Sequence, residues 1–154
     1  MGRLNYFRPK VLVAYASMAH LLAEEQLAGR LHISPSFVFG SSEVFTERAS
    51  RRVEEAWGRK PFEVYAATEP AGIASECDLH LGMHLFEDLI ITEVVDDKSR
   101  PVPPGIYGEK VLVTVLFSRT MPLIRYEMSD SVRPASSPRC SCERPFALID
   151  RIQG

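Results

Sequence analysis

Apolar positions divide the chain into two halves with different local patterns. In the first half, short apolar runs at residues 10–16, 36–40 and 62–65 alternate with stretches in which apolar residues recur every three or four positions. The short runs predict buried strands, and the longer stretches predict amphipathic helices. A strand–helix–strand–helix–strand order is typical of a parallel α/β layer.

Each predicted helix carries signals for its ends. Ser17 stands where an N-cap residue would, and Gly29 ends the first helical pattern. In the second pattern, Phe45 and Val53 share the apolar face, and Gly58 ends it. Glycine adopts the left-handed backbone that closes a helix at little cost, so both helix ends are indicated by the sequence.

The second half contains strand patterns and little helical periodicity. Two apolar runs are joined by residues 96–105, which are rich in proline and glycine. Because proline cannot donate a backbone hydrogen bond, we expect a turn there and neither a helix nor an inner strand. Regularly spaced strands with turn signals favour an antiparallel sheet or an open barrel. We therefore expect an α/β layer over residues 1–75 and a β-rich, barrel-like subdomain over residues 76–154. The predicted strands of this half span residues 88–95, 109–117, 122–127 and 146–152.

Composition narrows the class of protein. The 154 residues are 45% hydrophobic and 25% charged, with a formal net charge of −2, which is ordinary for a globular chain and argues against disorder. No apolar run is long enough to span a bilayer or to form a secretory signal. Lys and Arg are scattered, so we expect neither a nucleic-acid nor a membrane partner. Three cysteines, an odd number, suit a reducing compartment, and we expect a cytoplasmic protein.

Residues 65–69 (YAATE) form the first candidate site. They follow a predicted inner strand, and ligands bind at the carboxyl ends of strands in open α/β sheets. Tyr65 can stack on a purine ring, and Thr68 can offer its hydroxyl to a phosphate oxygen. Glu69 can hold a magnesium ion, which prefers oxygen ligands and phosphate partners. The alternative is a polar strand-to-loop turn that binds no ligand.

Two further segments carry polar residues next to predicted strands. Gly40, Ser41, Ser42 and Glu43 lie between a strand and a helix, where small residues let a flat ligand approach the backbone and the helix start favours an anion. Asp130 follows a strand and can accept hydrogen bonds from two ribose hydroxyls. For both segments the alternative is structural, namely a plain strand-to-helix turn and a capping or turn aspartate.

One metal site would account for all three cysteines. Cys77, Cys140 and Cys142, together with either His80 or His84, would form a Cys3His set, which is a closed structural zinc site. The alternative is three reduced, partly buried thiols, because a disulfide between Cys140 and Cys142 would be strained. A zinc site of this kind would use all three cysteines of the chain.

Taken in order along the chain, these segments resemble one family. The same order is seen in phenylacetate–coenzyme A ligases, which belong to the adenylate-forming acyl-CoA synthetase superfamily. The resemblance runs from about Arg8 to Gly154. The motifs that carry it are GSSE at 40–43, YAATE at 65–69, GMHLFED at 82–88, PLIRY at 122–126 with Asp130, and CSC at 140–142.

The resemblance implies a reaction and a role for each nucleotide-binding residue. In the family, a carboxylate attacks the α-phosphate of ATP, and the thiol of coenzyme A then attacks the acyl-adenylate. By this resemblance, residues 40–43 pack against adenine together with Tyr65. Thr68 contacts the phosphate, Glu69 binds magnesium and Asp130 binds the ribose. We expect Tyr65, Glu69 and Asp130 to converge on one hollow.

The resemblance also selects the metal ligands. Members of this branch with such cysteines look like zinc binders through Cys, His, Cys and Cys. That pattern maps to Cys77, His84, Cys140 and Cys142, and His84 fits it better than His80. The expected metals are therefore structural zinc in addition to magnesium.

The departures from the family limit the expected activity. Ala66, which the resemblance places beside the nucleotide, stands where the family has Gly. The family's phosphate loop and its domain with a catalytic lysine are not found in residues 1–154, which end where the hinge motif would begin. We therefore expect a fragment of an AMP-forming aryl- or acyl-CoA ligase that is inactive alone.

The partners follow from that expectation. The parent enzyme would bind a small carboxylic acid, ATP or AMP, and coenzyme A. Truncation would expose apolar surface, so we expect homodimers or swapped assemblies. The alternative function is a zinc-stapled nucleotide-binding or protein-interaction module without catalysis.

Overall fold

The computed structural model describes residues 1–137 and 139–153, and the chain forms two compact units, Met1–Val64 and Tyr65–Gly154. Each unit is described by itself. The domain division predicted after residue 75 stays a prediction, and Gly154, its last residue, lies outside the described residues.

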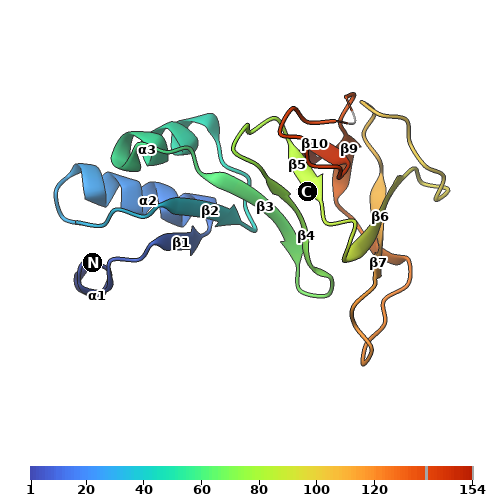
Figure 1. Cartoon of the computed structure of the whole chain (residues 1–154), viewed down its shortest axis with the longest axis horizontal. Helices are drawn as coiled ribbons and strands as arrows, with labels where there is room; N and C mark the ends of the chain where they lie inside the picture. Colours follow the sequence, from blue (N-terminus) through green and yellow to red (C-terminus); the bar gives the residue numbers. More distant parts are fainter. Residues whose placement is uncertain (138, 154) are drawn as a thin grey trace. The chain divides into compact units, whose positions relative to one another are not determined.

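The first unit contains the predicted parallel α/β layer. Its strands β1, β2 and the start of β3 pair in parallel, with Val11 opposite Phe37 and Phe39 opposite Phe62. Two crossover helices, α2 and α3, connect them, and a short helix precedes β1 (Figure 1). The elements are α1 (Gly2–Phe7), β1 (Val11–Ala14), α2 (Ala16–Leu27), β2 (Phe37–Ser41), α3 (Glu47–Trp57) and β3 (Phe62–Ala67).

Local chemistry defines the ends of α3. The side chain of Thr46 accepts a hydrogen bond from the backbone N–H of Ala49, which satisfies one of the free donors of the first turn. Gly58 closes the helix in the left-handed conformation at φ 69°, as predicted. The N-cap prediction for α2 was wrong, because Tyr15 is the N-cap residue and Ser17 lies inside the helix.

The core of the first unit lies between the sheet and the two helices. Because strand side chains alternate between faces, Leu12 and Val38 point toward the helices. Small residues of α2, such as Ala19 and Ala23, let the helix approach closely, and both are fully buried. The buried cluster comprises Leu12, Ala19, Leu22, Ala23, Leu31, Ile33, Val38 and Val53.

The second unit is built from antiparallel strands, as predicted. In one group β5 pairs with both β4 and β10, and β10 also pairs with β9. In the other group β7 lies between β6 and β8. Both sheets are open, so the described residues form no closed barrel. The strands are β4 (Ala71–Glu76), β5 (Met83–Leu85), β6 (Ile90–Val95), β7 (Lys110–Val115), β8 (Tyr126–Met128), β9 (Ser131–Pro134) and β10 (Leu148–Gln153).

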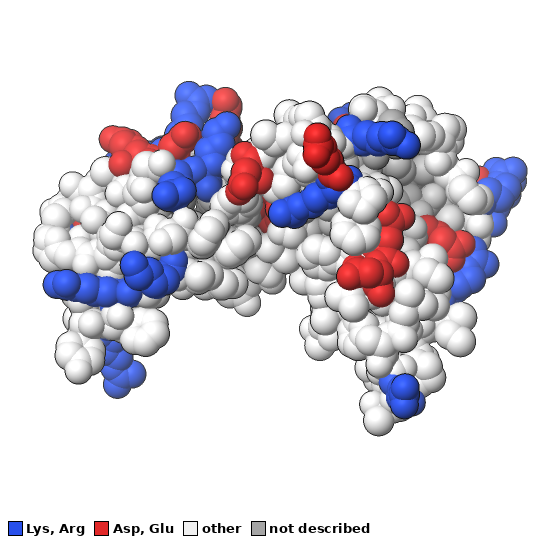
Figure 2. All heavy atoms as spheres, in the orientation of Figure 1, with Lys and Arg blue, Asp and Glu red and all other residues white. Residues whose placement is uncertain are grey.

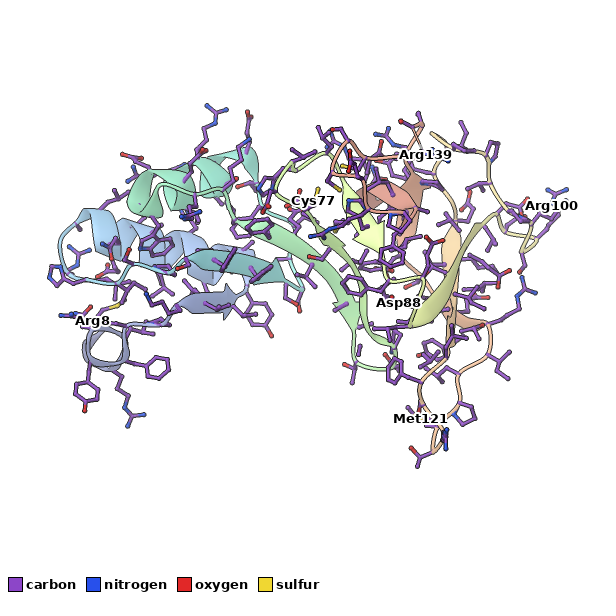
Figure 3. All side chains as sticks on the ribbon, viewed as in Figure 1. Arg8, Cys77, Asp88, Arg100, Met121 and Arg139 are labelled. Carbon is purple, nitrogen blue, oxygen red and sulfur yellow. The ribbon has the colours of Figure 1, made fainter. Side chains whose placement is uncertain are left out.

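The strand predictions for the second unit were partly wrong. Three strands, β4, β5 and β9, were missed, and the strand expected at residues 122–127 begins only at Tyr126. The preceding segment is instead part of a long connection from β7, with Met121 at its tip (Figure 3). The predicted Pro/Gly turn at residues 96–105 does join β6 to β7.

Charged residues of the first unit form pairs on the helices. Arg51 pairs with Glu47, and Arg52 bridges Glu24 of α2 and Glu55 of α3. Figure 2 shows blue and red side chains next to each other over α3.

Among the described residues, no helix has the length and apolar composition needed to cross a membrane.

Candidate functional site

The loop after β2 is shaped by contacts inside the first unit. Glu43 accepts a hydrogen bond on Oε2 from the backbone N–H of Ser17 at 2.8 Å, which holds the pKa of Glu43 below its usual range. Ser42 adopts a left-handed backbone at φ 66°. A Cβ atom at Gly40 would lie 2.2 Å from the ring of Phe45, so glycine is needed there for that packing. The predicted contact of residues 40–43 with adenine stays a prediction.

A hollow opens at the carboxyl ends of β1 and β2. Its volume is about 440 Å³, within the range of small-molecule sites. None of the six residues that line it is charged. They are Val13, Ala14, Tyr15, Met18, Ser41 and Ser42.

Tyr65 and Asp130 meet in the second unit although 65 residues separate them. The phenol of Tyr65, on β3, donates a hydrogen bond to Oδ2 of Asp130 at 2.9 Å. Tyr65 is 7% exposed, whereas Asp130 is half-buried in the short link between β8 and β9. Burial and the neighbouring carboxylate raise the pKa of Tyr65. Asp130 keeps one carboxylate oxygen free of this contact for a further donor.

A second hydrogen bond joins the same two segments. The phenol of Tyr126, on β8, donates to Oε1 of Glu69 at 3.1 Å, and this contact raises the pKa of Tyr126. Glu69 and Thr68 are exposed in the turn that follows β3. Ala66 lies within β3 and is half-buried. Because the Glu69 carboxylate is exposed, it can ligate a hydrated cation without a large desolvation cost.

The structure therefore brings three of the predicted nucleotide residues into one region of the second unit. Tyr65 lies on β3 and Glu69 lies in the turn after it, while Tyr126 begins β8 and Asp130 follows the end of that strand. The Gly40–Glu43 loop belongs to the first unit. Tyr126 was not assigned a role from the sequence. Its position four residues before Asp130, in a motif already singled out, was the available signal.

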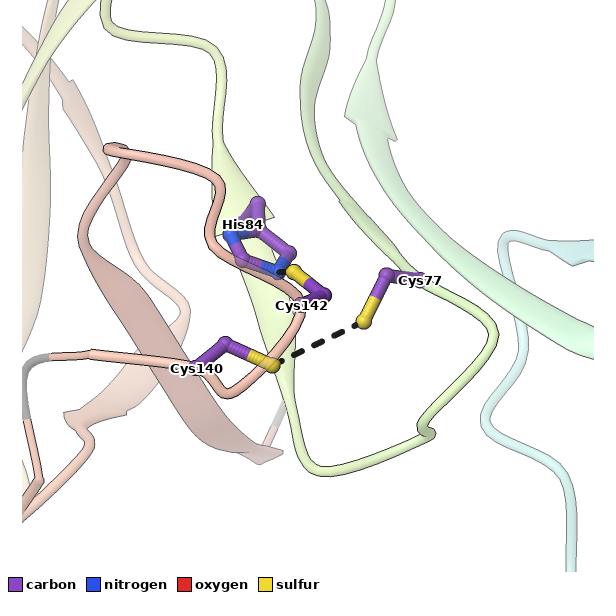
Figure 4. Close-up of side chains that lie close together, drawn as sticks. All are labelled: Cys77, His84, Cys140 and Cys142. Atoms are coloured by element: carbon purple, nitrogen blue, oxygen red, sulfur yellow. Dashed lines mark hydrogen bonds between the residues drawn. The ribbon is translucent and has the colours of Figure 1, made fainter.

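The four predicted zinc ligands form one cluster. Cys77 lies directly after β4, His84 is the middle residue of β5, and Cys140 and Cys142 lie on the loop before β10 (Figure 4). Their ligand atoms all lie within 4.8 Å of one another. Cys77 Sγ is 3.7 Å from Cys140 Sγ, and Cys142 Sγ is 3.3 Å from Nε2 of His84. The cysteines are free thiols.

These separations fit a tetrahedral zinc ion. In a tetrahedral site, zinc–sulfur bonds of about 2.3 Å and zinc–nitrogen bonds of about 2.0 Å place two ligand sulfurs roughly 3.8 Å apart. They place a ligand sulfur and the ligand nitrogen roughly 3.5 Å apart. The observed sulfur–sulfur and sulfur–nitrogen distances are close to those edges. Nδ1 of the fully buried His84 has no partner among the described residues, so Nε2, facing Cys142, is the ring atom directed at the cluster. The donor set therefore fits zinc.

The environments of the thiols differ. Burial raises the pKa of Cys77, whereas the backbone N–H of Arg144 lowers the pKa of Cys142. His80 is not a member of the cluster, since its Nδ1 lies 3.0 Å from Oε2 of Glu76. The structure thus places His84, and not His80, in the cluster with the three cysteines.

Comparison with known sequences gives two relatives of interest. Phenylacetate-coenzyme A ligase of Thermus thermophilus is 32% identical over 155 residues, which cover 96% of this chain and 34% of the relative. Protein CapK of Staphylococcus aureus is 24% identical, over 99% of this chain and 32% of the relative. No protein-family model matches the sequence. The chain spans about a third of the length of these relatives.

Solved structures of related proteins have a fold similar to that of this chain. A 2-hydroxyisobutyryl-CoA ligase in complex with 2-HIB-AMP and CoA superposes with a TM-score of 0.82 at 27% identity, over 99% of this chain and 35% of that chain. The N-terminal subdomain of Klebsiella oxytoca NpsA, bound to 3-hydroxyanthranilyl-AMSN, has a TM-score of 0.63 at 16% identity, over 88% of this chain and 39% of that chain. The second similarity is evidence for the fold alone.

Proposed function

This chain belongs to the adenylate-forming ligase family that includes phenylacetate–coenzyme A ligase, and from that premise we propose that it supplies nucleotide-binding residues of an AMP-forming acyl-CoA ligase. The proposed ligands are ATP or its AMP product, magnesium, a small carboxylic acid and coenzyme A. The observation that carries the proposal is the hydrogen bond between Tyr65 and Asp130.

The Tyr65–Asp130 contact suits a nucleoside. The phenol of Tyr65 donates one hydrogen bond that holds the Asp130 carboxylate in place. The other lone pairs of that carboxylate can then accept hydrogen bonds from the two vicinal ribose hydroxyls. In this proposal Tyr65 also packs against the adenine ring, for which an aromatic side chain is suited. Fixing the sugar fixes the α-phosphate for attack, which is how positioning contributes to rate.

Glu69 and Thr68 would serve the phosphates in the same proposal. Magnesium takes one or two carboxylates and completes its shell with water and phosphate oxygens, so the single exposed carboxylate of Glu69 suffices. When bound, magnesium neutralises charge that develops on the phosphates. The Thr68 hydroxyl would donate to a phosphate oxygen. Tyr126 would orient Glu69 through their 3.1 Å hydrogen bond.

The proposed reaction has two steps. The carboxylate of the acid attacks the α-phosphate of ATP and releases pyrophosphate, and the thiol of coenzyme A then displaces AMP from the acyl-adenylate. Neither the family's phosphate loop rich in Ser, Thr and Gly nor its domain with the catalytic lysine is found in residues 1–154, so the charge that develops on the phosphates lacks those partners here. We therefore propose that the chain binds nucleotide but does not turn over alone, and acyl-adenylate formation in a single turnover would contradict this.

Nucleotide binding can be measured by titrating AMP into the chain in a calorimeter. Asp130→Ala should weaken binding about tenfold or more, since it removes hydrogen bonds to a charged group. Asp97→Ala, which removes an exposed carboxylate from the turn between β6 and β7, is the matched control and should leave the affinity unchanged. No binding by the wild-type chain, or equal affinity of both variants, would contradict the proposal.

We further propose that Cys77, His84, Cys140 and Cys142 hold a structural zinc ion. The ion would join the β4–β5 region to the loop before β10, segments about 60 residues apart in sequence. Elemental analysis should find one zinc per chain, lost in Cys140→Ser and retained in His80→Ala. If zinc binds and AMP does not, the chain is better described as a zinc-stapled interaction module.

A further inference from the structure

A second hollow of the first unit opens at the amino ends of β1 and β2, at the opposite end of these strands from the hollow described above. Its volume is about 490 Å³, within the range of small-molecule sites. Arg8 is the C-cap residue of α1 (Figure 3), and Lys10 directly precedes β1. The six residues that line the hollow, none of them acidic, are Arg8, Lys10, Gln26, His32, Ile33 and Ser34. We call them the amino-end pocket.

Hydrogen bonds hold the segments around the amino-end pocket in place. The side chain of Asn5, on α1, accepts a hydrogen bond from the backbone N–H of His32 at 2.6 Å and donates one to the carbonyl of Arg30 at 3.3 Å. The carbonyl of Lys10 accepts a hydrogen bond from the backbone N–H of Ser36 at 2.7 Å. The loop after α2 and the chain before β1 are thereby fixed. A site whose backbone is already ordered loses less entropy when a ligand binds.

The polar groups of the amino-end pocket are mainly hydrogen-bond donors. Gln26 accepts a hydrogen bond on Oε1 from the backbone N–H of Ile33 at 3.0 Å, so its amide NH2 group is left to donate. Arg8 donates from Nε to the carbonyl of Asn5 at 3.3 Å, and a guanidinium has further N–H donors on its two terminal nitrogens. Among the described residues, neither Arg8 nor Lys10 forms an ion pair. A pocket of this kind suits an anion, which only accepts hydrogen bonds.

The acidic residues of α2 do not offset the positive charge of the amino-end pocket. Glu25 binds Arg30 through both carboxylate oxygens, at 2.7 and 2.6 Å, and this pairing holds the pKa of Glu25 below its usual range. Glu24 is paired in the same way with Arg52. The two cations of the pocket are therefore available to a ligand. Two cations beside one hollow attract a doubly charged anion more strongly than a singly charged one.

We propose that the amino-end pocket binds a phosphate group, either as free inorganic phosphate or as part of a small phosphomonoester. Near neutral pH such a group carries a charge of about −1.5 to −2 and has several acceptor oxygens. The Arg8 guanidinium can donate two parallel hydrogen bonds to phosphate oxygens, and Lys10 supplies a point charge. The Gln26 amide and the Ser34 hydroxyl can complete the contacts. The pocket lies in the first unit, so the inference does not depend on nucleotide binding in the second.

The test titrates inorganic phosphate, and separately phenyl phosphate, into the isotopically labelled chain without magnesium and follows the amide chemical shifts. At least one compound should shift amides of residues 8–10 and 26–34 to saturation, with an affinity that falls as ionic strength rises. Lys10→Gln and Arg8→Gln should each weaken binding about tenfold or more, because each removes a hydrogen bond between charged groups. Tighter binding of phenyl phosphate assigns the pocket to phosphomonoesters, and tighter binding of inorganic phosphate assigns it to the free ion.

Lys60→Gln is the matched control, because Lys60 is an exposed cation of the same unit that does not line the amino-end pocket. It should leave the affinity for phosphate unchanged. Acetate, with a single charge, should bind about tenfold more weakly than phosphate, or more weakly still. The proposal is overturned if neither phosphate compound binds to saturation, or if the shifts are confined to residues 65–69 and 126–130. Equal affinity of Lys10→Gln and Lys60→Gln, or acetate that binds as tightly as phosphate, would overturn it as well.

Discussion

The two units of this chain are stabilised by different means. The first unit relies on apolar packing between helices and one face of a parallel sheet, with Leu31, Val38 and Val53 almost completely buried. The second unit has an apolar core of its own but adds three thiols and one imidazole at 77, 84, 140 and 142, of which all but Cys142 are buried. The first unit should therefore respond most to lost volume, and the second to loss of the proposed zinc ion.

The largest expected effect is loss of the proposed zinc ion. Cys140→Ser, or treatment with a strong chelator, should destabilise the second unit by about 3 kcal/mol or more, because a structural metal contributes its binding energy to folding. Hydrogen exchange should become faster in β4, β5 and β10 and stay unchanged in β1 and β2. His80→Ala is the control and should retain the metal. If hydrogen exchange is unchanged after chelation, the second unit is not stabilised by a metal and does not differ from the first in that respect.

The second effect is a cavity in the first unit. Leu31 is fully buried, so Leu31→Ala should lower the free energy of unfolding by about 2 to 5 kcal/mol. The faster hydrogen exchange should be confined to β1, β2, α2 and α3, the reverse of the pattern expected for Cys140→Ser. Leu21→Ala, at a half-exposed position, should cost less than about 0.5 kcal/mol. Similar losses for both variants would argue against a tightly packed core.

A smaller effect is expected at the turn after β2. Gly40→Ala places a Cβ atom 2.2 Å from the Phe45 ring and should cost about 1 to 3 kcal/mol through overpacking. The cost should fall in a Phe45→Leu background, which a double-mutant cycle measures by urea denaturation. Gly2→Ala meets no atom within 4 Å and is the control. If the Gly40 penalty persists without the ring, the explanation by packing is wrong.

The smallest effect is a pH dependence from Tyr65. Its pKa in the folded chain is raised above the ordinary value of 10.0 by burial and by Asp130. Above pH 10 the unfolded chain releases a proton that the folded chain retains, so stability falls as pH rises, by up to about 1.4 kcal/mol per pH unit. Urea denaturation between pH 9 and 11 should show this slope.

Tyr65→Phe should flatten that slope, whatever it does to absolute stability. Tyr6→Phe, at a side chain that is 92% exposed, is the control and should keep the wild-type slope. Parallel pH profiles for the wild type and Tyr65→Phe would contradict the assigned cause.

The sequence predicted the first unit well because its signals are local. Periodic apolar residues and Gly58 specify α3 and its end without reference to distant residues. Of the missed strands, β5 has three residues and β9 has four, and β4, β5 and β9 are all held by pairing with other strands. Residues 83–85, for example, are a strand because they pair with both β4 and β10. Such pairing leaves little trace in the spacing of apolar residues.

The candidate sites show the same limit. Residue type and the resemblance singled out Tyr65, Glu69 and Asp130, but their hydrogen-bond partners depend on the tertiary fold. Spacing alone left His80 and His84 open and the resemblance favoured His84, while the structure places His84 on β5 in the cluster with the thiols. Tyr126 received no role because a tyrosine on a predicted strand looks like an ordinary core residue.

The central claim is that residues 65–69 and 126–130 form one nucleotide-binding region. The most direct test is to map amide chemical-shift changes in the labelled chain as AMP is added. The account predicts concentration-dependent shifts in both segments, and their loss in Asp130→Ala with the rest of the spectrum preserved. Shifts that avoid both segments, or no shifts at millimolar AMP, would contradict it.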